Sequence, residues 1–99
     1  MTPVDAPWHL RLYVAGDAPV SLAAFANLQV LCAAHLDEPY WIEVVDLVSH
    51  PEMAREDGII AIPTLVRRRP HPVCTVIGDL SNTARVLEGL RLPAEVIAS

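Results

Sequence analysis

The first stretch of the chain alternates between apolar and more polar positions. Across residues 8–14, Trp8 and every second residue after it are apolar, which is the two-residue period of a strand that turns one face toward a core. The segment Gly16-Asp17-Ala18-Pro19 then interrupts the alternation. Because a proline at the start of a helix removes no hydrogen bond that the helix needs, a helix is predicted from Pro19.

Residues 19–36 are rich in alanine and leucine, which favours a helix. An apolar stripe at helical spacing, interrupted only by Gln29, is predicted to face the core at Leu22, Phe25, Cys32 and Leu36. After Asp37-Glu38-Pro39 ends the helix, the aromatic and β-branched residues of 40–48 predict a second strand. The helix between the two strands requires them to lie parallel, in a right-handed βαβ unit.

The second half of the chain predicts a short helix, a hairpin and a last helix. Ser49 and Glu52 have the spacing of a capping box, so a helix is expected from there to Asp57, with Gly58 as its left-handed stop. Two strands, 63–67 and 73–77, are joined by the turn 69–72, which is short enough for an antiparallel hairpin. A final helix is expected between a cap from Ser81 and a stop at Pro93. The order βαβαββα is that of an α/β, thioredoxin-like fold.

Length and composition predict one small domain over residues 1–99. The chain is 53% hydrophobic, which is enough apolar material for one buried core. Its 12 acidic and 7 basic residues give a net charge of −5, which opposes binding to nucleic acid, because phosphates attract basic surfaces. No apolar run approaches the roughly 20 residues of a membrane span, and residues 1–5 lack the basic start of a secretory signal. A cytoplasmic protein with no membrane partner is therefore expected.

The residues that carry chemistry are missing from the places where this fold would use them. A thioredoxin-type enzyme needs a thiolate at the start of its first helix, but residues 16–21 contain no cysteine. Cys32 and Cys74 lack the spacing of a redox or zinc motif and are expected to be buried. The histidines show no metal-ligand spacing, and no glycine-rich loop suits a nucleotide. We therefore expect no enzyme activity, no metal and no cofactor; a redox protein that uses Cys32 or Cys74 is the alternative.

Three surface features remain as candidates for partner binding. The strand that begins at Tyr40 is expected at a sheet edge, where its unpaired backbone groups can pair with a strand of another chain. Asp46 is an acid in an otherwise apolar run, so it is predicted either to make a structural hydrogen bond or to reach a partner. Arg67, Arg68 and Arg69 form either a solvated strand end or a patch that recognises carboxylates of a partner.

Five sequence blocks occur in order and together carry a family resemblance. They are Leu12-Tyr13-Val14-Ala15-Gly16, Val45-Asp46, Glu56-Asp57, Pro63-Thr64-Leu65 and Ile77-Gly78-Asp79-Leu80-Ser81. With these blocks the chain resembles the KaiB family of circadian clock proteins over roughly residues 8–92, and the last block is the most specific of the five.

The resemblance implies a non-enzymatic adaptor that binds the N-terminal ATPase domain of a ring-shaped, KaiC-type ATPase. It also implies that a KaiA-like protein is captured and that the KaiB-like sensor of a histidine kinase is displaced. Carried over by position, the ATPase surface falls on Gly58, Ile59, Ile60 and Ala61, and the KaiA-like partner meets the edge strand at Ile42, Glu43 and Asp46. A sensor module of a histidine kinase is a further alternative, against which the chain's end at Ser99 is expected to count.

The resemblance also implies a second arrangement of the C-terminal half, which associates as homodimers or homotetramers. The residues expected in the region that changes are Pro63, Pro70, Pro72, Gly78, Asp79, Gly89 and Arg91. Gly89 inside a helical pattern costs about 1 kcal/mol relative to alanine, which weakens that helix. Peptide bonds before proline isomerise slowly, over tens of seconds or more, so such a change is expected to be slow.

Overall fold

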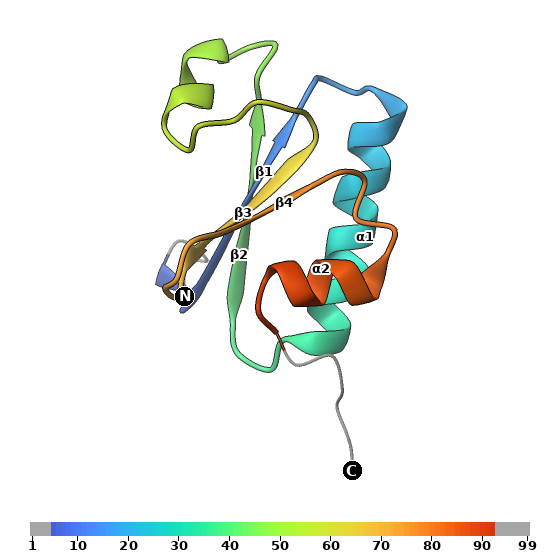
Figure 1. Cartoon of the computed structure of the whole chain (residues 1–99), viewed down its shortest axis with the longest axis vertical. Helices are drawn as coiled ribbons and strands as arrows, with labels where there is room; N and C mark the ends of the chain where they lie inside the picture. Colours follow the sequence, from blue (N-terminus) through green and yellow to red (C-terminus); the bar gives the residue numbers. More distant parts are fainter. Residues whose placement is uncertain (1–4, 93–99) are drawn as a thin grey trace.

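The computed structural model describes residues 5–92 and contains the predicted order of strands and helices (Figure 1). One element differs in type, because the fourth is a short 3-10 helix. The elements are β1 (Trp8–Val14), α1 (Pro19–His35), β2 (Tyr40–Asp46), η2 (Pro51–Arg55), β3 (Thr64–Arg69), β4 (Cys74–Ile77) and α2 (Thr83–Gly89).

The four strands form one sheet in the order β2-β1-β3-β4, so β2 and β4 are its edges. β1 and β2 are parallel, and their register runs from Trp8 opposite Tyr40 to Val14 opposite Asp46, which confirms the βαβ unit. β3 lies antiparallel to both β1 and β4. The predicted hairpin and the predicted edge position of β2 are therefore confirmed.

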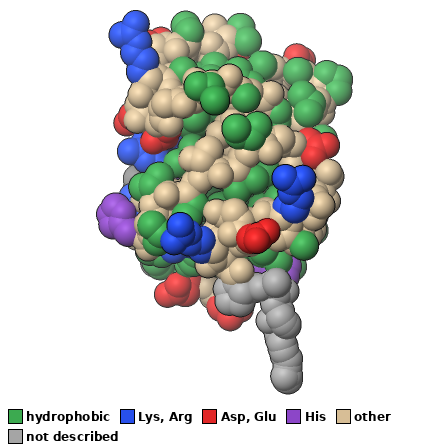
Figure 2. Space-filling model, in the orientation of Figure 1, with side chains coloured by type: hydrophobic (Ala, Val, Ile, Leu, Met, Phe, Trp, Pro, Cys, Tyr) green, Lys and Arg blue, Asp and Glu red, His purple; other side chains and the backbone are tan. Residues whose placement is uncertain are grey.

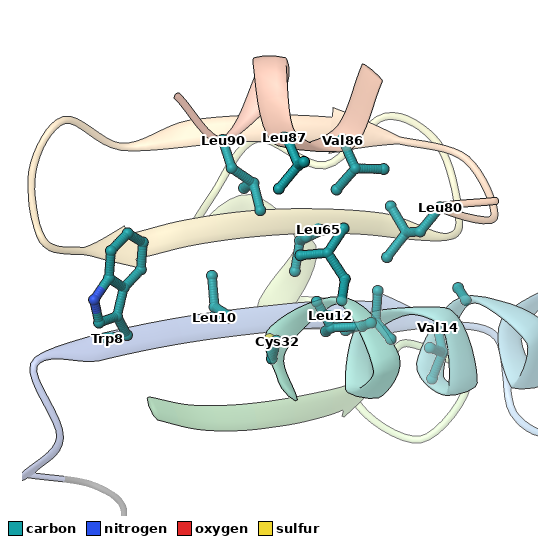
Figure 3. Close-up of a cluster of buried hydrophobic side chains, with 13 residues drawn as sticks. Trp8, Leu10, Leu12, Val14, Cys32, Leu65, Leu80, Val86, Leu87 and Leu90 are labelled. Carbon is teal, nitrogen blue, oxygen red and sulfur yellow. The ribbon is translucent and has the colours of Figure 1, made fainter. Parts of the chain in front are cut away.

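The main core lies between the sheet and the two helices, which cover the same face (Figure 1, Figure 3). Trp8, Leu10, Leu12 and Val14 of β1 supply its floor, as their alternation predicts. In Figure 3 the side chains of α2 point down into this layer. The remaining buried members are Ala24, Leu28, Leu31, Cys32, Leu65, Leu80, Val86, Leu87 and Leu90.

The predicted buried face of α1 was only partly right. Leu22 is 57% exposed, and Gln29 is also exposed, whereas Ser21, Ala24, Leu28, Leu31 and Cys32 are buried. The sequence of α1 is apolar nearly all round, so several stripes fit helical spacing equally well. Packing against the sheet buries the stripe that carries the small residues Ser21 and Ala24.

Both predicted serine caps were wrong. The η2 helix has no side-chain cap, and Ser49 instead donates a hydrogen bond to Asp46 at 3.3 Å. At α2 the cap is Asn82, whose side chain accepts from the backbone of Arg85 at 3.1 Å. The helix predicted to reach Asp57 is shorter, although Gly58 does adopt the predicted left-handed conformation, with φ of +63°.

Gly89 allows α2 to pack closely on β4. A Cβ at this position would lie 2.7 Å from Cγ2 of Val76, too close for a normal contact. The missing side chain therefore serves the packing of α2 in this arrangement, in addition to lowering its helix propensity. The chain reverses with left-handed residues on both sides of α2, at Leu80 (φ 63°) and Arg91 (φ 59°).

The other face of the sheet carries a smaller apolar cluster. Tyr13, Val45 and Val66 are buried there, and Leu47, Met53 and Ile59 pack against them. The segment that contains η2 thus covers the end of the second face. Neither of the two α-helices within residues 5–92 combines the length and apolar character that crossing a bilayer requires.

Leu87→Ala is expected to lower the free energy of unfolding by about 2–5 kcal/mol, because Leu87 is fully packed and the truncation leaves a cavity in the main core. Urea unfolding measures the change. Ala84→Gly, at an exposed position of the same helix, is the control for helix propensity and should cost only about 1 kcal/mol. A loss below about 1 kcal/mol for Leu87→Ala would contradict the packing.

Candidate partner interface

The second face of β1 carries polar side chains that are buried. His9, Arg11 and Tyr13 alternate with the core residues of the strand, and none is more than 6% exposed. The Arg11 guanidinium donates to Glu43 at 2.9 Å, to Glu56 at 2.7 Å and to the Tyr13 hydroxyl at 3.1 Å. Burial removes water from this charged group, which is unfavourable, and the hydrogen bonds to several acceptors compensate for that loss.

Glu56 and Asp57, which follow η2, are held by this cluster. The Tyr13 hydroxyl donates to Asp57 at 2.7 Å, and Arg11 lies 3.4 Å from the same carboxylate. Arg68 approaches Glu56 at 3.4 Å and Asp57 at 3.9 Å. The cluster therefore joins β1 and β3 to the start of the loop 58–61.

The pKa values of two carboxyl groups respond to Arg11. Its hydrogen bond and charge hold the pKa of Glu56 below its ordinary value. Burial alone raises the pKa of Glu43, but the hydrogen bonds from Arg11 and His9 outweigh burial and leave the pKa lowered. Both groups therefore act as anions at neutral pH, matched to the buried guanidinium.

The loop 58–61 presents an apolar surface to solvent. Ile60 is 91% exposed, and Ile62, which follows the loop, is 40% exposed. Beside them is an open groove of about 470 Å³, lined by Leu47, Pro51, Ala54, Ile59, Ile60, Ala61 and Ile62. Figure 2 shows hydrophobic side chains gathered over the upper part of this view, where Figure 1 places the η2 segment and the first turns of α1.

The side chains singled out on the edge strand are engaged within the chain. Ile42 packs against the main core, and Glu43 accepts from Arg11 and also lies 2.6 Å from His9. Asp46 accepts from the backbone of Gly16 and Val48, each at 2.9 Å, and these bonds hold its pKa low. The structural hydrogen bond expected for Asp46 is confirmed, so β2 offers its backbone edge and the exposed Val44.

Arg67 is placed in the interior and not on a surface for partners. It is 7% exposed, lies 4.7 Å above the ring of Trp8 and donates to the backbone carbonyls of Pro70 and Leu90. The sequence predicted either a solvated strand end or a partner patch for the arginine run, and neither prediction describes the buried Arg67. The run separates because alternate residues of a strand point to opposite faces, which sends Arg67 toward α2 and Arg68 toward Glu56.

The predicted burial of both cysteines is confirmed. Burial raises the pKa of Cys32 to about 12, which keeps its thiol protonated and unreactive at neutral pH. The hydroxyl of Ser21 accepts from the backbone of Ala15 at 3.1 Å, so it makes a structural hydrogen bond at the loop before α1. Within residues 5–92, no three histidine, cysteine or acidic side chains come together as metal ligands do.

One part of this surface was missed from the sequence, and the other, the loop 58–61, was singled out only through the family resemblance. The apolar run from Ile59 to Ile62 after Gly58 is a signal for the exposed groove, because it matches neither a strand nor a helix pattern. The Arg11 cluster gives no local signal, since Arg11 and Glu56 are 45 positions apart. Only the fold brings them together.

Comparison with solved structures shows which class of fold this is. The N-terminal domain of Synechococcus elongatus SasA superimposes with a TM-score of 0.72 at 19% identity, covering 98% of this chain and 95% of that domain. Mitochondrial thioredoxin 3 from Saccharomyces cerevisiae gives a TM-score of 0.68 at 19% identity, covering 89% and 81% of the two chains. The protein is thioredoxin-like in fold, and the start of its α1 lacks a thiol.

Sequence comparison gives the family. Residues 11–92 match the KaiB domain. The circadian clock oscillator protein KaiB of Thermostichus vulcanus is 41% identical over 97 residues, which cover 98% of this chain and 90% of that protein. The circadian clock protein KaiB3 of Synechocystis sp. is 40% identical over 86 residues, covering 87% and 84%. This chain belongs to the KaiB family, whose relatives are named as circadian clock proteins.

Glu56→Gln is expected to weaken the pH dependence of stability in acid. Because the folded pKa of Glu56 lies below its ordinary value of 4.5, the carboxylate stabilises the fold above that pH, and this contribution is lost as the pH falls through the lowered folded pKa. Urea unfolding at about pH 6 and about pH 3.5 should show a smaller loss for the variant than for the parent chain. Glu88→Gln, at an exposed site on α2, is the control, and an equal loss in all three proteins would contradict the Arg11–Glu56 pair.

Proposed function

We propose that this protein is a non-enzymatic clock adaptor that docks on a KaiC-type ATPase ring through the loop 58–61 and the groove beside it. The observation that carries the proposal is Ile60, which is 91% exposed next to an apolar groove. An exposed large apolar side chain within an apolar patch is typical of a surface that another protein covers. Membership of the KaiB family supports a partner from a circadian system.

The charge of the chain also favours a protein partner. A net charge of −5 opposes nucleic acid, and the acidic residues nearest the loop, Glu56 and Asp57, are neutralised by Arg11 and Arg68. The groove therefore offers apolar contact with little local repulsion. Such a surface fits an apolar patch on the ATPase domain better than a strongly charged one.

The edge of β2 is the second surface of the proposal. Within residues 5–92, β2 has a neighbour on one side only, and its partly buried side chains at Ile42, Glu43 and Asp46 make contacts within the chain. A KaiA-like partner would therefore bind mainly by adding a strand through backbone hydrogen bonds. Competition with the KaiB-like sensor of a histidine kinase would take place at the ATPase, through the loop 58–61.

A second arrangement of the C-terminal half, with association into dimers or tetramers, is part of the proposal. Support comes from α2, which has seven residues and is flanked by Leu80 and Arg91 in left-handed conformations. Such conformations of non-glycine residues cost of order 1–3 kcal/mol each, and two folds of one sequence need differ by only a few kcal/mol. The segment that would rearrange contains Pro63, Pro70, Pro72, Gly78, Asp79 and Gly89.

Ile60→Ser is expected to weaken binding to the ATPase at least about tenfold, because burying an isoleucine is worth about 1.5–3 kcal/mol. The side chain is exposed in the free protein, so thermal stability should stay unchanged. Val30→Ser is the matched control, because Val30 is 70% exposed on α1, outside the proposed surface. Titration of the ATPase in ATP with each labelled protein measures affinity, and equal affinities would remove the loop from the interface.

A further inference from the structure

The loop proposed to dock is attached to the body of the protein at two kinds of contact. Ile59 packs on Tyr13, Val45 and Val66, and its backbone donates to Ala54 at 2.8 Å. Ionic contacts hold Glu56 and Asp57, just before the loop. The two kinds of contact predict different responses to the loss of charge.

Arg11 is the centre of the ionic attachment. Its guanidinium lies within 3.4 Å of carboxylates from Glu43, Glu56 and Asp57, and it is 6% exposed. If residues 56–57 moved away, this buried cation would lose two of its three counter-charges, which is costly in a poorly solvated site. The guanidinium therefore opposes any displacement of the chain just before Gly58.

The same guanidinium reaches the edge strand through Glu43. Arg11 Nε donates to Glu43 of β2, while its Nη1 donates to Glu56 beside the loop. The planar fork of arginine can serve two such acceptors at once, whereas a lysine ammonium acts as a point charge. The two surfaces in the proposed function are thus tied to one buried side chain.

We propose that Arg11 is the positioning residue for the loop 58–61: it fixes the loop in its docking conformation through Glu56 and Asp57. The proposal rests on the proposed function for its effect on binding. Its effect on the loop is independent of any partner. Loss of Arg11 should leave the sheet intact but make the loop more mobile. Docking should weaken for that reason only.

Hydrogen exchange of the free protein, measured by NMR, tests the effect on the loop. In Arg11→Met, the amides of Gly58 and Ile59, which donate to Arg55 and Ala54, should exchange at least about tenfold faster. Amides that join β1 to β3 should keep their rates. Arg11→Lys should restore part of the protection, and Arg85→Met, at an exposed site on α2, should behave as the parent chain.

Affinity for the KaiC-type ATPase in ATP tests the effect on docking. Arg11→Met should bind at least about fivefold more weakly, with Arg11→Lys between it and the parent chain. If Arg11→Met does not fold, Asp57→Asn takes its place, because the amide keeps an oxygen for the Tyr13 hydroxyl but removes the charge that faces Arg11.

The outcomes separate the proposal from the function on which it rests. Unchanged exchange at Gly58 and Ile59 overturns it, since packing of Ile59 then suffices to hold the loop. Faster exchange with unchanged affinity overturns the role in docking. If the parent chain does not bind the ATPase, the proposed function fails, while the exchange rates still decide whether Arg11 positions the loop.

Discussion

β1 is buried along its whole length, and its two faces need different partners. The apolar face meets α1 and α2, as an alternating strand requires. The opposite face places a guanidinium, an imidazole and a phenol where water is scarce, so acceptors must come from elsewhere in the chain. Glu43 of β2 and the segment Glu56–Asp57 supply them. The position of the edge strand and of the chain after η2 follows from this requirement.

The same constraint shapes the surface offered to partners. Glu56 and Asp57 are held by Arg11, the chain turns at the left-handed Gly58, and Ile60 projects into solvent. Arg11 and Arg68 neutralise Glu56 and Asp57, and the residues that line the groove are all apolar. In a protein with a net charge of −5, that contrast marks the loop as a place for contact with another protein.

The strands, the helices and their order could be predicted, because hydrophobic period and turn residues are local signals. The buried face of α1 could not, since an apolar helix offers several stripes and packing against the sheet selects one. The cap of α2 was predicted at Ser81 but is its neighbour Asn82, because the two residue types cap helices about equally well. The contacts of Arg67 and Arg11 could not be predicted for a different reason. Their partners lie 23 and 45 positions away, and strand register decides which face of the sheet each arginine occupies.

Binding to the ATPase is the central claim, and the mass of the complex tests it most directly. The protein would be passed through a size-exclusion column with light scattering, alone and with a KaiC-type ATPase in ATP. The account predicts that it moves into a ring-sized complex when the ATPase is present, while the free protein gives the mass of its resting assembly. Continued elution at the free mass with the assembled ring present would contradict the account.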